Sequence, residues 1–425
     1  MITNVPQDVS ISSAHEILDV QTTDCCIVGG GPAGAVLALL LARQGISVML
    51  LEAHKDFDRD FRGDTIHPSV MQIMEELGLS DRLLQLPHSK MRQIRVKTPE
   101  NTFTMADFSH LKTRYPYITM LPQVKFLEFI TQEAQQYPCF QLVMGANVQE
   151  LIEEDGVIHG VRYRGAGGWH EIRAMLTVGA DGRHSRLRQL GNFVAVETSP
   201  PMDILWFRLP RQPEDEAGGM GRFAPGRIIA MLDRGDEWQI AYVIPKGGYQ
   251  KLRATGLAAL KQSVVEVVPE LSDGVPPSVA DRIHSLHDWS QVAFLSVESS
   301  LVKHWCRPGL LLIGDAAHVM SPVGGVGINY AIQDAVVAAN VLTKPLQNHH
   351  VEISDLAKVQ RQRELPTRII QAFQTLIQKR IFAPVLAADS PFQSPVPPIL
   401  LRLPILRDLP ARLIALGVFP VHVKV

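Results

Sequence analysis

The chain has little of the material from which disulfide frameworks, zinc sites and nucleic-acid interfaces are built. Its 425 residues include only four cysteines, Cys25, Cys26, Cys139 and Cys306, with no C-x-x-C pair. We therefore expect neither disulfides nor a metal. Lysine and arginine number 41 against 43 acidic residues, and the pI is near 6.7. A nucleic-acid-binding protein usually has a basic surplus, so no nucleic-acid partner is expected.

Long apolar runs, internal repeats and targeting signals are also missing. No uncharged apolar stretch reaches the roughly 18 residues that a membrane-spanning helix needs. The N-terminal stretch lacks the basic-then-apolar pattern of a secretory signal. At 46% hydrophobic residues the chain can form a substantial core. We expect a soluble, cytoplasmic protein in a reducing compartment.

Glycine is concentrated where an apolar strand meets a helix, in "CCIVGGGPAGAVLALLLAR". Gly29 would make the tight turn, Gly31 would let the backbone approach a pyrophosphate, and Gly34 would let helix and strand pack closely. The helix N-terminus offers free N–H groups to phosphates. Glu52 ends the next strand and can accept hydrogen bonds from a ribose. The predicted dinucleotide-binding residues are Gly29, Gly31, Pro32, Ala33, Gly34 and Glu52.

Two later junctions have the same strand-to-loop form. Asp181-Gly182 ends the apolar run "MLTVGA", and Gly314-Asp315 ends "LLLI". Asp-Gly is also a common plain turn, and Asp155-Gly156 is interpreted as such a hairpin. Because the carboxyl ends of parallel strands meet at one edge, we expect the three loops to lie together at a ligand site. The predicted cofactor-binding residues here are Asp181, Gly182, Gly314 and Asp315.

The three motifs, in this order and spacing, resemble the FAD-dependent aromatic monooxygenases of the para-hydroxybenzoate hydroxylase type, over roughly residues 22–380. The resemblance implies non-covalent FAD, with NADPH or NADH as a transient reductant, O2 and a small-molecule substrate. It also implies that Arg62 and Gln123 contact the cofactor and that Asp315 bonds a ribitol hydroxyl. A neutral hydroxyl suits an ionised aspartate better than a pyrophosphate does, because like charges repel.

The stretch "PVGGVGIN" from Pro322 to Asn329 is expected to run along the flavin ring, where side chains would collide with a flat tricycle. A helix expected over about 327–342 would direct its N-terminus at the ring and stabilise reduced flavin. The alternative is a helix cap with packing glycines. We assign the ring environment to Pro322, Gly324 and Gly325, with no acid or base side chain. Further predicted cofactor contacts are Gly325, Val326, Gly327, Ile328 and Asn329.

Histidines outside these motifs, His67 and His88, and His318 within the third, have no metal-like spacing and are interpreted as ordinary residues. The arginines Arg183, Arg186 and Arg188 form a basic cluster that is a weak candidate for contacting the reductant. No second G-x-G-x-x-G motif follows a strand, so NAD(P)H has no domain of its own.

The fold class expected is α/β: a Rossmann-like FAD-binding domain with an inserted antiparallel β-sheet substrate domain and a helical C-terminal region. The expected parts are 22–195 and 301–380 for FAD, 196–300 for the substrate sheet and 381–425 for a segment packed on the core. In "WQIAYVIP", Trp238, Ile240, Tyr242 and Ile244 share one face, and Gln239, Ala241 and Val243 share the other. Either face could line the site.

The last segment is rich in proline and leucine, and we expect short amphipathic turns broken by Pro404 and Pro410. The arginines Arg402, Arg407 and Arg412 punctuate apolar residues, so a membrane-surface role is the alternative to packing on the core. The oligomeric state stays open.

The function expected is hydroxylation of an electron-rich, aromatic or polyketide-like molecule through a flavin hydroperoxide. Three alternatives remain. A flavin-dependent reductase or dehydrogenase would act on an isoprenoid or a quinone. A flavin-dependent halogenase would share the fold, although "WQIAYVIP" lacks the second tryptophan of a W-x-W-x-I-P pattern. A non-catalytic flavoprotein would consume no oxygen with NAD(P)H.

Overall fold

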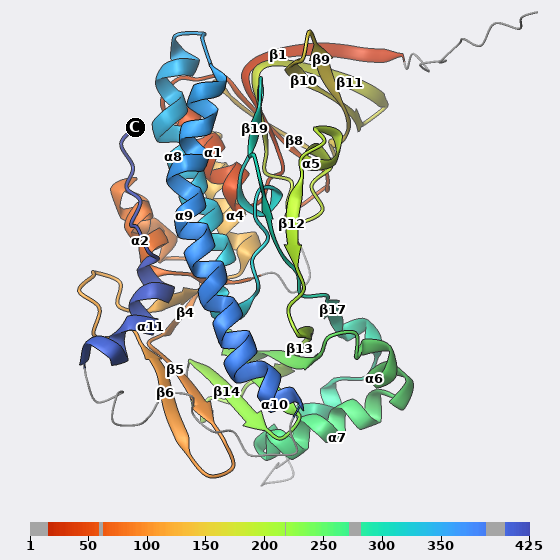
Figure 1. The fold of residues 1–425 in the computed structure, drawn as a ribbon, viewed down its shortest axis with the longest axis vertical. Coiled ribbons are helices and arrows are strands. Elements are labelled where there is room, and N and C mark those ends of the chain that lie inside the picture. The colour runs from red at the N-terminus through yellow and green to blue at the C-terminus, as the bar shows by residue number, and fades with distance from the viewer. Residues whose placement is uncertain (1–15, 59–62, 217, 272–281, 388–403) are drawn as a thin grey trace, which may run out of the picture.

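Two large sheets and the helices packed on them make up the molecule (Figure 1). The computed structural model describes residues 16–58, 63–216, 218–271, 282–387 and 404–425. The predicted α/β class, with a Rossmann-like sheet, an antiparallel sheet and a helical C-terminal region, is confirmed.

The first sheet is the predicted dinucleotide-binding sheet, in the order β19-β20-β11-β1-β2-β8. Its central strands are apolar runs buried on both faces, as parallel strands between helical layers require. β9 and β10 extend it as a hairpin from β11, joined by the predicted turn at Asp155-Gly156. The strands are β1 (Ile17–Val28), β2 (Val48–Glu52), β8 (Phe140–Met144), β9 (Asn147–Glu154), β10 (Val157–Gly165), β11 (Gly168–Gly179), β19 (Cys306–Arg307) and β20 (Leu310–Leu312).

One strand boundary differs from the prediction. β1 begins at Ile17, whereas the apolar run suggested a start at Cys25. Its first half alternates between partly buried and exposed residues and pairs with β11 beyond the helical layer. Such a half-exposed stretch has no continuous run of apolar residues, so the start of this strand could not be predicted from the sequence.

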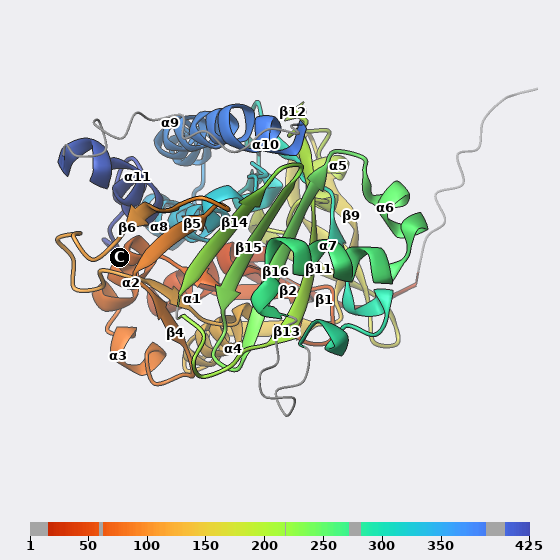
Figure 2. The same cartoon turned by 90° about the horizontal axis from the view of Figure 1, so that it is seen from below.

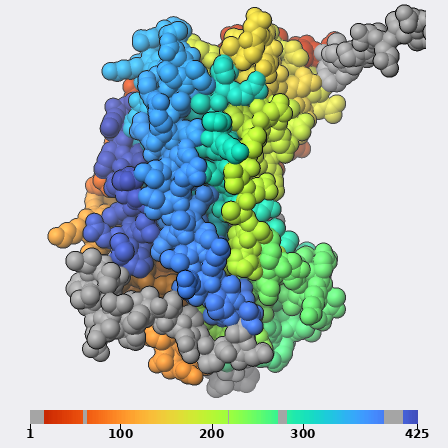
Figure 3. Space-filling view, in the orientation of Figure 1, coloured from red at the N-terminus to blue at the C-terminus, as the bar shows by residue number. Residues whose placement is uncertain are grey.

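Helices fill both sides of this sheet. α1 (Pro32–Arg43) is buried along nearly its whole length and packs on α8 and α4, which explains why it is apolar all round. α8 runs from Gly327 to Gln347, one turn beyond the predicted end. α9 (Ile353–Ile377) runs along the surface seen in Figure 3. The other helices are α2 (Pro68–Glu76), α3 (Ser80–Leu83), α4 (Gln123–Ala134), α5 (Arg186–Leu190), α6 (Tyr249–Thr255), α7 (Leu257–Val267), α10 (Ala383–Ala387) and α11 (Pro404–Leu416).

The second sheet is the predicted substrate sheet, in the order β17-β13-β16-β15-β14-β5-β6. α7 packs on one face of it and α10 on the other (Figure 2). β5 and β6 precede the expected substrate segment in sequence, and β5 joins β14 in parallel. The division into domains stays a proposal, with this sheet drawing strands from two parts of the chain. The strands are β5 (Gln93–Lys97), β6 (Thr102–Asp107), β13 (Met202–Pro210), β14 (Gly219–Ala224), β15 (Arg227–Asp233), β16 (Glu237–Pro245) and β17 (Ala293–Leu295).

Two smaller sheets complete the fold. β3 (Thr65–Ile66), β7 (Ile118–Met120) and β4 (Ser89–Met91) form one, and β12 (Ala195–Thr198) pairs with β18 (Ser299–Val302). None of the helices in the described ranges is long and apolar enough to cross a bilayer.

The C-terminal helix corrects one prediction. α11 begins at Pro404, a position where proline is tolerated because its missing N–H would have no partner in the first turn. Pro410 lies inside the helix and does not end it. Ala411, Ile414 and Ala415 pack into an apolar cluster with β6 and β7, and this packing offsets the hydrogen bond that proline cannot make. Residues 388–403, including Arg402, lie outside the described ranges.

Candidate active site

Three loops meet at the carboxyl edge of the first sheet, as the sequence predicts. β1 pairs in parallel with β11, and β11 pairs in parallel with β20. Gly29, Ala180 and Ile313 therefore follow neighbouring strands on the same edge, and the residues of all three motifs begin there.

The loop after β1 is shaped by close backbone approaches. Gly29 has a φ of +106°, and an added Cβ would lie 2.4 Å from the Ala180 carbonyl oxygen. A Cβ on Gly34 would lie 2.0 Å from the Gly29 carbonyl oxygen, so α1 packs against the loop as predicted. A Cβ on Gly31 would meet no atom within 4 Å. Two of the glycines are thus needed for packing, and the third leaves its backbone open to a ligand.

Glu52 closes this loop from the end of β2. Its Oε2 accepts a hydrogen bond from the Gly30 N–H at 2.9 Å, and its Oε1 accepts from the His54 N–H at 3.0 Å. The residue is 8% exposed. His54 Nδ1 also lies 2.8 Å from Oε1, so the protein already holds both carboxylate oxygens at the end of β2.

The Asp-Gly loop holds itself together. Asp181 accepts hydrogen bonds from the Ser185 hydroxyl at 2.6 Å and from the Leu187 N–H at 3.0 Å, at the start of α5. Burial raises the pKa of the Asp181 carboxyl, although these bonds oppose the shift. Gly182 has a φ of +82°, and a Cβ there would point into open space. Asp181 shapes the loop, and Gly182 exposes its backbone.

Arg188 joins the second loop to the third. Its Nη1 donates to the carbonyl oxygens of Ala316 at 3.1 Å and Asp315 at 3.3 Å, and its Nη2 donates to the Arg183 carbonyl. The Arg188 side chain therefore links the two loops. The sequence had instead made it a weak candidate for contacting the reductant, together with Arg183 and Arg186. Arg183 donates to the Ser296 carbonyl oxygen, and Arg186 is exposed.

A buried ionic cluster supports the third loop from α8. Asp334 is fully buried and accepts from the Gly314 N–H at 3.0 Å and from Arg363 Nε at 2.7 Å. His318 Nε2 lies 2.6 Å from the same carboxylate. Burial alone would raise the pKa of Asp334, but His318 and Arg363 outweigh it and lower that pKa. His318, interpreted from sequence as an ordinary residue, fixes the turn in which Asp315 lies half-exposed.

The stretch from Pro322 to Asn329, hereafter the ring loop, needs glycine at two positions. Gly324 has a φ of +80° and Gly325 one of +63°. A Cβ on Gly325 would lie 2.8 Å from Thr65 Oγ1, which donates to the Gly325 carbonyl oxygen. A Cβ on Gly327, where α8 begins, would meet no atom within 4 Å. The ring loop is half-buried, and its accessible part consists of backbone groups and the uncapped N-terminus of α8.

A clasp of long-range hydrogen bonds holds the ring loop. Asn329 Oδ1 accepts from the His67 N–H at 2.8 Å, and its Nδ2 donates to the carbonyl oxygens of Thr65 and Gly325. His67 Nδ1 lies 2.8 Å from the Ile414 carbonyl oxygen of α11 and donates to it, since a carbonyl only accepts. Burial lowers the pKa of His67 to about 4, so its ring is neutral at pH 7. Asn329 is thus bonded within the protein, and Val326 is buried in an apolar cluster with Ile414.

The backbone of Gln123 is linked to the second sheet through the carboxylate of Asp64. Asp64 accepts from the Gln123 N–H at 3.1 Å and pairs with Arg234 at 2.9 Å. Burial raises the pKa of Asp64, and the Arg234 charge opposes this. Arg234 lies in the turn between β15 and β16, so the pair ties the substrate sheet to the cofactor side. Arg62, predicted to contact the flavin, lies outside the described ranges.

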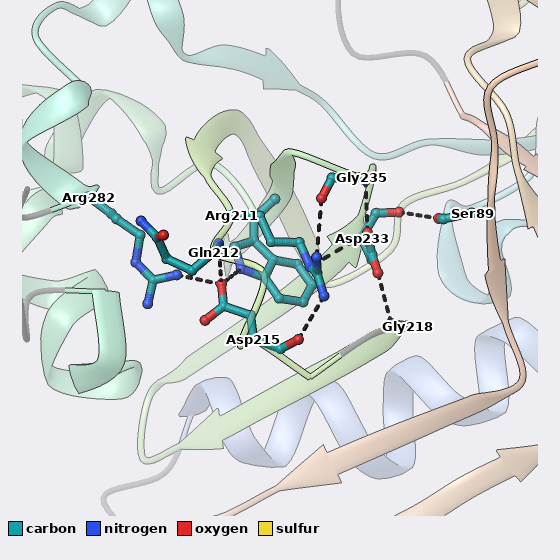
Figure 4. A network of polar contacts seen from close by, with 9 residues as sticks. Ser89, Arg211, Gln212, Asp215, Gly218, Asp233, Gly235 and Arg282 are labelled. Atoms are coloured by element: carbon teal, nitrogen blue, oxygen red, sulfur yellow. Dashed lines mark hydrogen bonds and ion pairs between the residues drawn. The ribbon is translucent and has the colours of Figure 1, made fainter. Parts of the chain in front are cut away.

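The turn that carries Arg234 is braced by the network in Figure 4. Arg211 donates to the carbonyl oxygens of Gly235 at 3.2 Å and Asp215 at 2.7 Å, and Asp233 accepts from the Gly235 N–H at 2.8 Å. Ser89 from β4 donates to the Asp233 carbonyl. These bonds fix the position from which Arg234 reaches Asp64.

The structure decides which face of β16 is turned toward the ring loop. The Tyr242 face, with Trp238, packs against α7. Ala241 and Val243 belong to the cluster against which Val323 of the ring loop packs. The face with Gln239, Ala241 and Val243, hereafter the inner face, is therefore the one that approaches the site.

Comparison with known proteins now decides the family. Residues 22–364 match the family described as FAD binding domain. The chain is 34% identical over 327 residues to 6-methylpretetramide 4-monooxygenase of Streptomyces rimosus, covering 76% of each protein. The chain belongs to this family of FAD-dependent aromatic monooxygenases.

Two further matches are to proteins named as a monooxygenase and as a hydroxylase. The chain is 23% identical to para-nitrophenol 4-monooxygenase of a Pseudomonas species, with 76% of this chain and 78% of that protein aligned. The structure of OxyS anhydrotetracycline hydroxylase from Streptomyces rimosus gives a TM-score of 0.71 at 21% identity, covering 93% of this chain and 76% of that one. At this identity the structural match supports the fold alone. The protein is an oxidoreductase, and FAD is its cofactor.

The residues at the sheet edge fit FAD. α1 and α8 both begin without a side-chain cap, which leaves backbone N–H groups for a pyrophosphate and for an electron-rich ring. Backbone is open at Gly31, Gly182 and Gly327, one position at each loop. Within the described ranges no cluster of side chains is suited to a metal ion.

Sequence reasoning missed the side chains that hold the loops. Asp64, Thr65 and His67 lie in the "FRGDTIHP" stretch, in which only Arg62 was given a role and His67 was interpreted as an ordinary residue. Asp334 lies in the largely apolar α8, and Arg363 is one of several charged residues of α9, so neither was singled out. A charged residue within an otherwise apolar helix, such as Asp334 in "AIQDAVVAA", was the one available signal.

Proposed function

We propose that the monooxygenase hydroxylates an aromatic polyketide, using NADPH or NADH and O2. One oxygen atom of O2 is inserted into a C–H bond of the substrate to give a hydroxyl group, and the other leaves as water with the hydride of NAD(P)H and a proton, so the nicotinamide is oxidised. The observation that carries this proposal is the packing of Val323 in the ring loop with the inner face of the substrate sheet. The 34% identity to a protein named for a pretetramide substrate supports the substrate class.

We also propose how the chain holds FAD. Gly29, Gly31, Pro32, Ala33 and Gly34 would surround the pyrophosphate, with Glu52 on the ribose. Asp315, half-exposed at the sheet edge, would accept from a ribitol hydroxyl. Gly182 and Gly314 would allow close approach, while Asp181 acts by shaping its loop. Gln123 and Arg62 stay predicted contacts.

FAD, once bound and reduced, supplies the activation of oxygen. The chain supplies position and electrostatics. The N–H groups of α8 from Gly327 would stabilise negative charge on a bound ring, and Gly324 and Gly325 would let the backbone lie close to it. The inner face of the substrate sheet would exclude water from the site. A transient visit by NAD(P)H, a cytoplasmic location and the absence of membrane binding stay predictions.

The proposal is tested with purified protein. Denaturation should release FAD into the filtrate. Aromatic polyketides with free phenol groups should accelerate NADH or NADPH oxidation and gain one oxygen atom, measured by oxygen uptake and product mass. Release of no FAD would contradict the cofactor assignment. FAD-loaded protein that consumes no NAD(P)H with any phenolic polyketide would contradict the proposed reaction.

A further inference from the structure

The inner face of the substrate sheet has a row of small residues at its centre. Trp206 of β13 pairs with Ala241 of β16, Ala241 with Ala230 of β15, and Ala230 with Gly221 of β14. Paired residues share a face, so these four lie on one line across four strands. Ala241, Ala230 and Gly221 are hereafter the small-residue row, and Trp206 lies at its end. Beyond Trp206, the row presents nothing larger than a methyl group.

The inner face is fully buried at one end and partly exposed near this row. Toward one end, Ile228, Val243 and Phe223 are buried against residues of α10. At the row, Ala230 and Trp206 are only partly buried, although both lie within the sheet. The outer-face neighbours on the same strands are buried beneath α7. The row is therefore a flat surface that is buried at Ala241 and Gly221 and partly exposed at Ala230.

Two polar atoms beside the row lack protein partners. Gln239 is 2% exposed, and its Oε1 has no hydrogen-bond partner among the residues that the structure describes. The same holds for Nε1 of Trp206. Gln239 lies two residues from Ala241 and so on the same face. A buried acceptor and a buried donor at one surface are costly unless a further molecule satisfies both.

We propose that Gln239 and Trp206 orient the substrate, which is a flat, fused-ring polyphenol lying over the small-residue row. Gln239 Oε1 accepts from a phenolic or enolic hydroxyl, and Trp206 Nε1–H donates to a carbonyl or phenolate oxygen. The two residues are diagonal neighbours with Cβ atoms roughly 7–8 Å apart, so a ligand that meets both is wider than one hydroxyl group. This assignment rests on the proposed function and names the substrate class of the same site.

The test uses FAD-loaded protein without reductant and two probes, 1,8-dihydroxyanthraquinone and unsubstituted anthraquinone, with 4-nitrophenol as a single-ring probe. Binding is measured by equilibrium dialysis and by the change in flavin absorbance. We expect wild type to bind the dihydroxy compound at least about tenfold more tightly than the other two. Gln239→Leu and Trp206→Phe should each weaken that binding about three- to tenfold. Tyr242→Phe, on the outer face of β16, is the control: it loses the hydrogen bond to Ser263 but should leave probe binding unchanged.

Stability separates a ligand role from a structural one. Gln239→Leu removes an unpaired acceptor, so its melting temperature should equal or exceed that of wild type. A lower melting temperature with unchanged probe preference would assign Gln239 to a buried water and overturn the inference. Equal binding of all three probes, or of none, would also overturn it. Oxygen uptake with NAD(P)H is assayed separately, so the proposed function can fail while the binding preference stands, and the reverse.

Discussion

The loop after β1 and the ring loop after β20 are both rich in glycine, but they are held in different ways. Glu52 pins the first loop across 22 residues of sequence, and its glycines contact the adjacent loop backbone. The ring loop is held from Thr65 across 260 residues, and His67 extends the clasp to Ile414 across 347. The first loop is built into the sheet edge, whereas the second depends on segments from both ends of the chain.

This difference separates binding from reactivity. The first loop must hold a pyrophosphate in one place, and rigid local packing serves that purpose. The ring loop lies where the substrate sheet, β3 and α11 converge, so its position depends on how all three are packed. Variants at the two loops should therefore separate loss of the cofactor from loss of its reaction.

The largest effect is expected in the first loop, at Gly34. Gly34→Ala would place a methyl group 2.0 Å from the Gly29 carbonyl oxygen, forcing α1 away from the sheet. Overpacking of this kind usually costs about 1–3 kcal/mol, and here we expect the upper end or more. Denaturant unfolding of the apoprotein measures it.

Gly31→Ala is the matched control, because its methyl group would enter open space. This variant should fold like wild type and lose FAD affinity, since the methyl group takes the place of the pyrophosphate. Wild-type FAD affinity in Gly31→Ala would show that the cofactor does not approach this backbone. Wild-type stability in Gly34→Ala would show that the loop is not set by packing.

The next effect concerns the clasp and its pH dependence. Burial lowers the pKa of His67 from 6.5 to about 4 in the folded protein, so folding disfavours the protonated ring. Its contribution to stability is complete above pH 6.5 and is lost as the pH falls toward 4. The loss reaches about 3 kcal/mol.

His67→Asn isolates this contribution, because an amide can still donate to the Ile414 carbonyl oxygen but does not titrate. The difference in unfolding free energy between wild type and variant should change by that amount between pH 7 and 4. A difference that is independent of pH would mean that His67 is not buried as a neutral ring. FAD affinity of the variant should stay close to that of wild type, because the first loop is untouched.

Gly325→Val tests the ring loop itself. The side chain would meet Thr65 and take a φ of +63°, at a cost of about 1–3 kcal/mol. FAD should still bind through the first loop, but a ring displaced by about 1 Å loses roughly a hundredfold in rate. Gly156→Val, which takes a comparable φ of +79° in the β9–β10 turn with open space around its Cβ, is the control for backbone strain alone. Anaerobic reduction by NADH at the wild-type rate in Gly325→Val would identify these glycines as packing residues.

The same contrast explains how much the sequence could reveal. The first loop was predictable down to single residues, because the requirements for Gly29 and Gly34 arise within one strand-turn-helix unit. The clasp was not, since nothing near Thr65 or His67 in sequence indicates a partner more than 250 residues away. Pro410 was misjudged for the same reason, because tertiary packing on β6 outweighs its local tendency to break a helix. The inner face of β16 could not be chosen, because both faces are apolar and only the position of α7 distinguishes them.

The smallest effect on folding is expected at Glu52, where the first loop meets the cofactor rather than the core. Glu52→Gln keeps an oxygen that can accept from Gly30, so the loop and the melting temperature should change little. What the variant loses is the charge that strengthens a hydrogen bond to a ribose hydroxyl, and FAD affinity should fall about tenfold. Glu52→Ala also releases the Gly30 N–H and should lower affinity further, toward a hundredfold. Titration of apoprotein with FAD, followed by flavin fluorescence, measures both. If Gln and Ala weaken FAD equally and both destabilise the apoprotein, Glu52 serves to brace the loop, and the ribose contact must be assigned elsewhere.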